Sequence, residues 1–217
     1  MTNMKSLNLT RPQILMVVGL PGAGKSFFAR QFSETFSAPV VSLDRIRFEL
    51  FNKPSFSADE NDLVTRLAAY QIEELFKTNR SFIVDGGCNA KVDRVKLVQQ
   101  AKKAGYDASV IWVQTDAATS RVRAIKRSSR REDDKYNVSL SGQQYDAFAR
   151  RFTEPTSENY VVISGKHTYN AQAKTVLRKL VAVREARADA AHRHEVVQSK
   201  QASERPAPAQ RRDITIR

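Results

Sequence analysis

The octapeptide GLPGAGKS, from Gly19 to Ser26, matches the phosphate-binding pattern G-x-x-x-x-G-K-[ST] at every fixed position. The residues before it, QILMVV at 13–18, form a short apolar run that predicts a buried strand. The residues after it, FFARQF at 27–32, place apolar side chains at helical spacing. A strand, a glycine-rich turn and a helix in this order are the context in which the pattern binds phosphate.

Each residue type in this stretch has its own expected role in holding a nucleotide. Main-chain N–H groups of the loop and of the helix N-terminus point at anionic oxygens, and the glycines let the backbone come close to them. Lys25 is expected to neutralise the β- and γ-phosphates, and the Ser26 hydroxyl is expected to ligate Mg²⁺. The predicted nucleotide-binding residues are Gly19, Pro21, Gly22, Ala23, Gly24, Lys25, Ser26 and Phe27.

Length and composition favour a soluble cytoplasmic protein. The 217 residues are enough for one α/β domain with its own core. No apolar run approaches the roughly 20 residues of a membrane span, and residues 1–11 have no apolar signal-peptide core. The single cysteine, Cys88, excludes an intrachain disulfide and a cysteine-based zinc site.

The formal net charge of +13 favours polyanionic partners such as nucleic acid or anionic lipid. A phosphate-handling protein or one with a basic tail can reach the same charge without a polymer partner. Both interpretations stay open from charge alone.

Apolar strands alternate with helices along the chain, which predicts an α/β fold with a parallel sheet of about five strands and helices on both faces. After the first strand, further strands are expected at 39–43, 81–85, 108–113 and 160–163. Helices are expected at 46–51, 57–78, 91–104, 117–128, 143–152 and 172–183. In the second of these helices the predicted buried side comprises Leu63, Leu67, Tyr70, Ile72, Leu75 and Phe76.

The predicted division of the chain has three parts. An N-terminal extension at 1–12 precedes a nucleotide-binding domain at 13–185. Residues 186–217 lose apolar periodicity and are rich in Ala, Arg, Gln and Pro, which predicts a basic and largely disordered tail. The closing helix could also continue through Val197.

Two acids follow predicted strands, where the carboxyl ends of parallel strands line a ligand crevice. Asp44 is the candidate base for a substrate hydroxyl, or else a plain helix N-cap. Arg47, on the same helical face, could hold a phosphate or the acceptor. Asp85 could act at the Mg²⁺ site or hold the acceptor, or be a turn residue before Gly86. Asn89 is a weaker candidate for the acceptor side.

A dense basic run lies between residues 121 and 131. It could be a solvated helix face, or part of a lid at about 127–141 that closes arginines over the transferring phosphate. Arg127 and Arg131 are four residues apart, so both can face the same way if the helix continues. The order of helix, polar segment and helix favours the lid.

The ordered set of motifs resembles the P-loop kinases of the polynucleotide 5′-hydroxyl kinase group, which includes the zeta-toxin-like kinases. The features that carry the resemblance are GLPGAGKS at 19–26, Asp44 and Arg47, FIVD at 82–85, KRSSRR at 126–131, and RFTEP at 151–155 followed by Glu158. The resemblance covers about residues 14–163. It implies ATP and Mg²⁺ as cofactors. It implies Lys25 and Ser26 at the phosphates, Asp44 as the general base, Arg47 on the acceptor side, and Arg127 or Arg131 from the lid.

The resulting hypothesis is an ATP-dependent kinase that phosphorylates a hydroxyl, with a nucleic-acid 5′-OH as the first candidate acceptor. A small-molecule kinase of zeta-toxin type, acting on a nucleotide sugar, an antibiotic or a metabolite, is the alternative enzyme. A nucleotide-gated binding or adaptor protein is the alternative from a different class.

Overall fold

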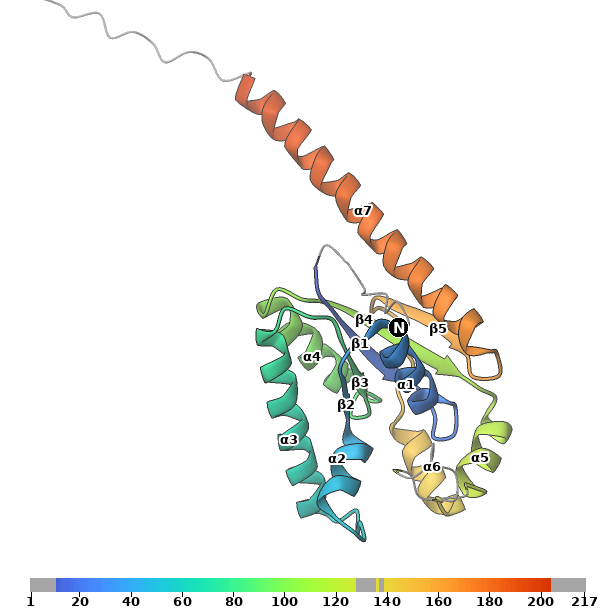
Figure 1. The fold of residues 1–217 in the computed structure, drawn as a ribbon. Helices are drawn as coiled ribbons and strands as arrows, with labels where there is room; N and C mark the ends of the chain where they lie inside the picture. Colours follow the sequence, from blue (N-terminus) through green and yellow to red (C-terminus); the bar gives the residue numbers. More distant parts are fainter. Residues whose placement is uncertain (1–10, 128–135, 137–138, 204–217) are drawn as a thin grey trace, which may run out of the picture. The chain divides into compact units, whose positions relative to one another are not determined.

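The computed structural model describes residues 11–127, 136 and 139–203 of the chain. A parallel sheet of five strands has the order β2-β3-β1-β4-β5 (Figure 1). The strands are β1 (Gln13–Val18), β2 (Val40–Ser42), β3 (Phe82–Asp85), β4 (Asp107–Gln114) and β5 (Tyr160–Ser164). The predicted α/β architecture with about five parallel strands is therefore confirmed.

Seven helices connect or follow these strands in the described part of the chain. They are α1 (Lys25–Phe36), α2 (Leu43–Leu50), α3 (Ala58–Lys77), α4 (Lys91–Lys103), α5 (Ala117–Ile125), α6 (Gly142–Arg151) and α7 (Tyr169–Ser203). Polar side chains fix several of their starts: Ser57 accepts a hydrogen bond from the Glu60 amide, and Ser141 forms a capping box with Gln144.

The chain divides into two units, residues 1–179 with the whole sheet and residues 180–217. Helix α7 continues to Ser203, so most of the stretch predicted as a disordered tail is helical as far as it is described. Alanine, arginine and glutamate are strong helix formers, and this propensity outweighs the missing apolar periodicity. Residues 204–217 lie outside the described residues.

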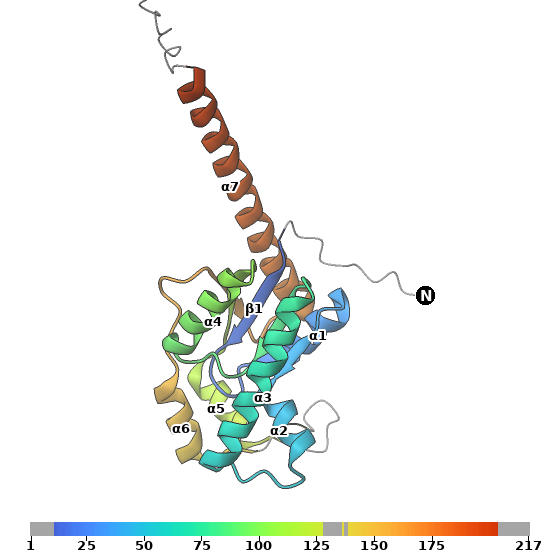
Figure 2. The ribbon, with the colours of Figure 1, turned by 90° about the vertical axis from the view of Figure 1, so that its left-hand side faces the viewer.

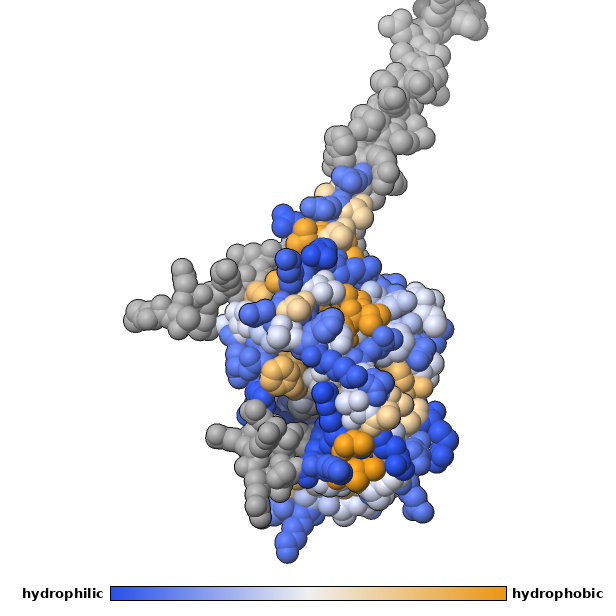
Figure 3. Space-filling view, turned by 90° about the vertical axis from the view of Figure 1, so that its right-hand side faces the viewer, coloured by the Kyte–Doolittle hydropathy of each residue, from blue (hydrophilic) through white to orange (hydrophobic). Residues whose placement is uncertain are grey.

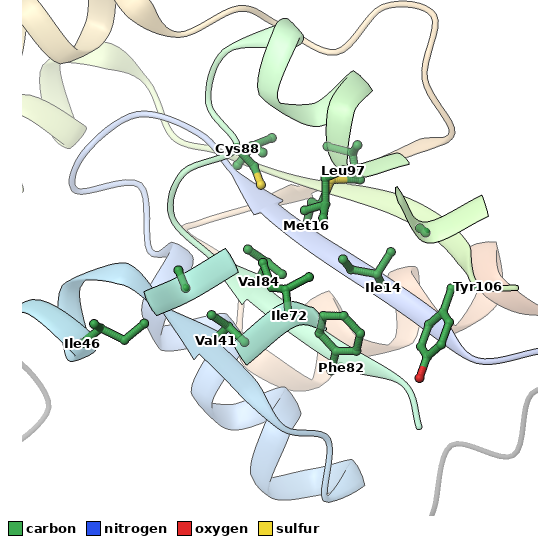
Figure 4. Close-up of a cluster of buried hydrophobic side chains, with 14 of the residues drawn as sticks. Ile14, Met16, Val41, Ile46, Ile72, Phe82, Val84, Cys88, Leu97 and Tyr106 are labelled. Atoms are coloured by element: carbon green, nitrogen blue, oxygen red, sulfur yellow. The ribbon is translucent and has the colours of Figure 1, made fainter. Parts of the chain in front are cut away.

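Strand alternation divides the core between the two faces of the sheet. On one face Ile14, Met16 and Val18 pack in a cluster with buried residues of α3 and α4 (Figure 4). On the other face Leu15 and Val17 are equally buried, on the side where α1 contacts β1 and β3. Both faces are therefore covered, which explains why β1 is apolar at every position from Ile14 to Val18 instead of alternating.

Cys88 belongs to the first of these clusters (Figure 4). Burial raises the pKa of its thiol to about 12. The thiol is therefore protonated at neutral pH and serves as a small packing group, because the thiolate is the nucleophilic form.

The buried side of α3 differs from the prediction at two positions. Leu63 and Tyr70 are 44% and 61% exposed, whereas Val64, Ala68 and Ile72 form the buried stripe. These three residues are spaced by four, so they align along one face, and the larger side chains at 63 and 70 turn outward. The remaining expected residues pack against the core with partial burial: Leu67, Leu75 and Phe76.

The surface is predominantly polar where Figure 3 shows it, with hydrophobic residues in small, separate groups. Within the described part of the chain, no helix has both the length and the apolar character that crossing a membrane requires.

The register of the sheet brings three strand ends together. Asp85 at the end of β3 pairs with Val17 of β1 on one side and with Ser42 of β2 on the other. Because these strands are parallel, the loop that begins at Gly19 and the helix that carries Asp44 start at the same edge. Helices α2, α5 and α6 lie beyond this edge in both ribbon views (Figures 1 and 2).

A buried ion pair supports the connections beside this edge. Arg94 of α4 is fully buried and donates from Nε to Glu158 at 2.7 Å. Its Nη1 donates to the carbonyl oxygens of Cys88 and Asn89. Burial alone would raise the pKa of Glu158, but hydrogen bonds from Arg94 and the Thr156 amide outweigh it and lower that pKa. The pair therefore fixes the loop after β3 against the segment before β5.

Replacing Glu158 by Gln should lower the free energy of unfolding at pH 7 by about 3 kcal/mol, because the buried Arg94 guanidinium loses its opposite charge. A lowered folded-state pKa gives stability that is complete above the unfolded-state pKa and is lost as the pH falls through the folded value. The difference between wild type and variant should therefore shrink below the ordinary glutamate pKa of 4.5.

Urea unfolding at several pH values tests this expectation, with the exposed Glu154→Gln as the matched control. An equal effect of the two substitutions at pH 7 would contradict it.

Candidate active site

A cleft of about 1190 Å³ opens where β1, β2 and β3 end. Its lining combines the glycine loop with the start of α2, the end of β3 and the end of α5. Six predicted catalytic or metal-site residues line it: Lys25, Ser26, Asp44, Arg47, Asp85 and Arg127. The other predicted catalytic residue, Arg131, lies outside the described residues.

The glycine loop leads directly into α1, whose N-cap is Gly24. Glycine has no side chain that could accept a hydrogen bond from the first N–H groups of the helix. Free N–H groups and the positive end of the helix dipole favour an anion at this position. Lys25 Nζ donates to the carbonyl oxygens of Gly19 and Leu20, both at 3.0 Å, and so lies across the loop. The arrangement fits the nucleotide phosphates that the motif predicts.

Residues that follow β4 and β5 pack against the glycine loop. Thr115 Oγ1 donates to the Ala23 carbonyl at 3.1 Å. A Cβ at Gly165 would lie 1.9 Å from that same carbonyl oxygen, and one at Gly22 would lie 2.2 Å from the Ser120 carbonyl oxygen. The backbone therefore packs too closely at these glycines for any side chain.

Asn89, considered above as a candidate for the acceptor side, contacts the glycine loop. Its Oδ1 accepts a hydrogen bond from the Gly19 amide at 3.2 Å, and its carbonyl oxygen accepts from Arg94 and from the Thr153 amide. Asn89 lines the cleft, but its side-chain oxygen is hydrogen-bonded to the first residue of the glycine loop. It therefore positions the loop.

Asp44 lies in the first turn of α2, and Ser42 is the N-cap, accepting from the Arg45 amide. The simple capping interpretation of Asp44 is therefore wrong, and Asp44 lines the cleft. Desolvation by the surrounding protein raises the pKa of Asp44, and the negative charge of Asp85 raises it further. Lys25 and Arg127 act in the opposite direction.

Asp85 is buried at the base of the same cleft. Burial raises the pKa of Asp85, while a hydrogen bond from the Ser26 hydroxyl and the charges of Lys25 and Arg127 lower it. Burial also lowers the pKa of Lys25, against which Asp85 and Asp44 act. Two carboxylates, one ammonium and one guanidinium thus form a single electrostatic group.

Arg47 lines the cleft but uses both terminal nitrogens within the protein. Nη1 makes a buried ion pair with Glu60, and Nη2 donates to Asn61 Oδ1 at 2.7 Å. Among the residues that the structure describes, none is hydrogen-bonded to Nε. Glu60 at the start of α3 balances the charge of Arg47, so the direct role of Arg47 toward a phosphate or the acceptor stays a prediction.

Arg127 follows α5, and its carbonyl accepts from Ser139 Oγ at 2.7 Å. The Leu140 amide donates to the Ala124 carbonyl at 3.1 Å. The two described ends of the predicted lid segment therefore lie against each other and against α5. Residues 128–135 and 137–138 lie outside the described residues, so the lid itself stays a prediction.

Sequence reasoning did not identify the loop contacts of Thr115 and Gly165 or the ion-pair role of Glu60. The only available signal was the position of each after a predicted strand or near a predicted helix start. Thr115 and Gly165 belong to no local motif, because they act on residues that are distant in the chain, and the ion pair of Glu60 joins two separate helices.

Gly165→Ala should weaken ATP binding about tenfold, because overpacking at the Ala23 carbonyl displaces the glycine loop and typically costs about 1–3 kcal/mol. Isothermal titration with ATP and Mg²⁺ measures this. Gly142→Ala is the control, since a Cβ there meets only the flexible end of Arg121. Unchanged affinity in the Gly165 variant would show that the loop does not depend on this close contact.

Comparison with known proteins agrees with this geometry. The model of the AAA_33 family, described as an AAA domain, matches residues 14–155. No curated protein matches the chain in sequence.

Several solved structures share the fold. A candidate kinase from Chloroflexus aurantiacus aligns with a TM-score of 0.62 and 14% identity, over 78% of this chain and 99% of that chain. Kti12 of Chaetomium thermophilum in complex with ADP-AlF3 aligns with a TM-score of 0.58 and 17% identity, over 76% of this chain and 95% of that chain. The APS kinase CysC of Mycobacterium tuberculosis in complex with AMPPNP and APS aligns with a TM-score of 0.56 and 18% identity, over 78% of this chain and 98% of that chain. Since the family model spans most of the chain, including the glycine loop and both acids, this protein belongs to the AAA domain family with a nucleotide-binding P-loop fold.

Proposed function

We propose that the protein is an ATP-dependent kinase that transfers the γ-phosphoryl group to a hydroxyl. The observation that carries this proposal is the gathering of Lys25, Asp44 and Asp85 in one cleft beside the glycine loop. Arg127 is coupled electrostatically to all three. Phosphoryl transfer needs positioning, neutralised charge and an oriented nucleophile, and this set supplies a candidate for each.

The proposed reaction is an in-line displacement at the γ-phosphorus. The acceptor oxygen forms a bond to phosphorus, the bond to the β–γ bridging oxygen breaks, and ADP leaves. The Asp44 carboxylate takes the proton of the acceptor hydroxyl. Lys25 and Arg127 stabilise the negative charge on the phosphate oxygens.

The residues present also fit Mg²⁺. A hydroxyl and a carboxylate, Ser26 and Asp85, adjoin each other at the loop, and both are hard oxygen donors. In the part of the chain that the structure describes, no three His, Cys, Asp or Glu side chains cluster as a metal site. This suits Mg²⁺, which takes most of its ligands from phosphates and water. Bound there, Mg²⁺ would neutralise charge on the phosphate oxygens.

Asp44→Asn should lower kcat by about 10²- to 10⁴-fold, the range for loss of a general base, and leave ATP affinity within about threefold of wild type. Single-turnover transfer and isothermal titration separate the two quantities. Asp62→Asn, an exposed acid of α3 outside the cleft lining, is the control. Retained turnover in the Asp44→Asn variant would contradict the proposed catalytic role of Asp44. A nucleotide-gated adaptor, in contrast to a kinase, would keep its function in this variant.

For the acceptor we propose the 5′-OH end of a nucleic acid. Five cationic side chains line the cleft besides Lys25 and Arg47: Arg30, Arg123, Lys126, Arg127 and Arg151. With a net charge of +13, these cations favour a phosphate-bearing acceptor. The resemblance of the motif set to polynucleotide 5′-hydroxyl kinases supports the same acceptor.

Incubation with γ-labelled ATP should transfer label to 5′-OH oligonucleotides and not to the same oligonucleotides with a 5′-phosphate. The apparent KM should rise steeply with salt, because phosphate contacts release counterions. Gel analysis of the labelled products measures this. Label on sugars, antibiotics or nucleotide sugars, with none on oligonucleotides, would overturn this acceptor.

One observation favours a small-molecule acceptor as the second candidate. Glu60 balances the charge of Arg47, which makes that wall of the cleft less cationic than the sequence suggests. An uncharged hydroxyl compound could therefore be accepted there. The same labelling panel distinguishes the two acceptors.

A further inference from the structure

The turn before α3 places an aromatic ring at the wall of the cleft. Phe56 is 36% exposed and lines the cleft together with Phe48 and Phe148. Its backbone has a φ of 57°, in the left-handed region. A bulky side chain rarely adopts this conformation, which costs about 1–2 kcal/mol. An exposed ring on a strained backbone therefore needs a structural cause.

Glu60 supplies the cause by gathering donors from the turn. Its Oε2 accepts from the Ser55 amide and the Ser55 hydroxyl, both at 2.7 Å, and from the Phe56 amide at 3.2 Å. Burial would raise the pKa of Glu60, but the hydrogen bonds from Arg47, Ser55 and Phe56 outweigh it and lower the pKa to about 2. The carboxylate therefore stays charged and holds the turn at every ordinary pH.

Asn61 holds the other side of the same turn. Its Nδ2 donates to the Phe56 carbonyl at 3.1 Å, while its Oδ1 accepts from Arg47. The guanidinium of Arg47 lies over the Phe56 ring at 4.7 Å from the centroid. One network of contacts thus joins Arg47, Glu60 and Asn61, and together they fix the position of the Phe56 ring.

A ring held this firmly at the edge of a cationic cleft is suited to stacking. The Arg47 guanidinium lies over the ring, and Phe56 is still partly exposed at the wall of a cleft that has both apolar and cationic lining residues. Planar bases stack on aromatic side chains regardless of their sequence, and such stacking is favourable without any charge on the ligand. The cationic residues of the cleft supply attraction for the phosphates of the same molecule.

We propose that Phe56 is the stacking platform for the terminal nucleobase of the acceptor, and that it sets the preference for an acceptor bearing a base. This inference rests on the proposed nucleic-acid 5′-OH acceptor. It assigns Arg47, Glu60 and Asn61 as positioning residues of the platform.

The test compares two 5′-OH oligonucleotides that differ only in whether the terminal nucleotide carries a base or is abasic. For the full-length wild-type chain, the KM should be about 5- to 100-fold higher for the abasic end, the range that stacking of one base supports, with kcat within about twofold. Phe56→Asn should raise the KM for the normal end by the same factor and show no further rise for the abasic end. Asn tolerates the left-handed backbone, so this variant should unfold at the wild-type temperature or above it.

Phe56→Tyr should restore the base preference, and Tyr70→Ala, an exposed aromatic on the outer face of α3, should leave it unchanged. Equal KM values of wild type for the two oligonucleotides would overturn the platform while leaving the nucleic-acid acceptor intact. A base preference that persists in Phe56→Asn would also overturn it. Absence of transfer to every 5′-OH end would overturn the acceptor itself and the platform with it.

Discussion

Two carboxylates and a lysine ammonium share one cleft because three parallel strands end at the same edge of the sheet. The register sets Asp85 between Val17 and Ser42, and the chain can then place Asp44 and the glycine loop only on either side of it. Desolvation raises the pKa of Asp44, the charge of Asp85 raises it further, and the charges of Lys25 and Arg127 lower it. A nucleotide brings further negative charge, so the cations of the loop and of the segment after α5 are a condition for its binding.

The second requirement is a rigid loop, and distant parts of the chain supply it. Asn89 holds the Gly19 amide, and Thr115 holds the Ala23 carbonyl. Gly165 leaves room for that carbonyl because it has no side chain. Arg94 and Glu158 in turn fix the backbone of Asn89. The glycine loop is therefore one face of a packed unit, which lowers the entropy that phosphate binding must overcome.

Local patterns predicted what local chemistry decides. The glycine loop, the five strands and the start of α3 at Ser57 all follow from residues close together in the chain. The rest depends on contacts between distant residues: the Arg47 ion pair with Glu60 crosses from α2 to α3, and Gly165 reaches the loop from the end of β5. Two residues of the buried stripe of α3, Val64 and Ala68, were not predicted for a related reason, since their smaller side chains allow the closer approach to the core.

The most direct test of this account is a crystal structure with a non-hydrolysable ATP analogue, Mg²⁺ and a 5′-OH oligonucleotide. The account predicts the γ-phosphate at the main-chain N–H groups of the loop beside Lys25. It also predicts an Asp44 carboxylate oxygen about 3 Å from the acceptor hydroxyl, within hydrogen-bond reach. An Asp44 side chain turned to bulk solvent, away from the terminal phosphorus and the hydroxyl, would contradict the catalytic role and leave only a nucleotide-binding protein.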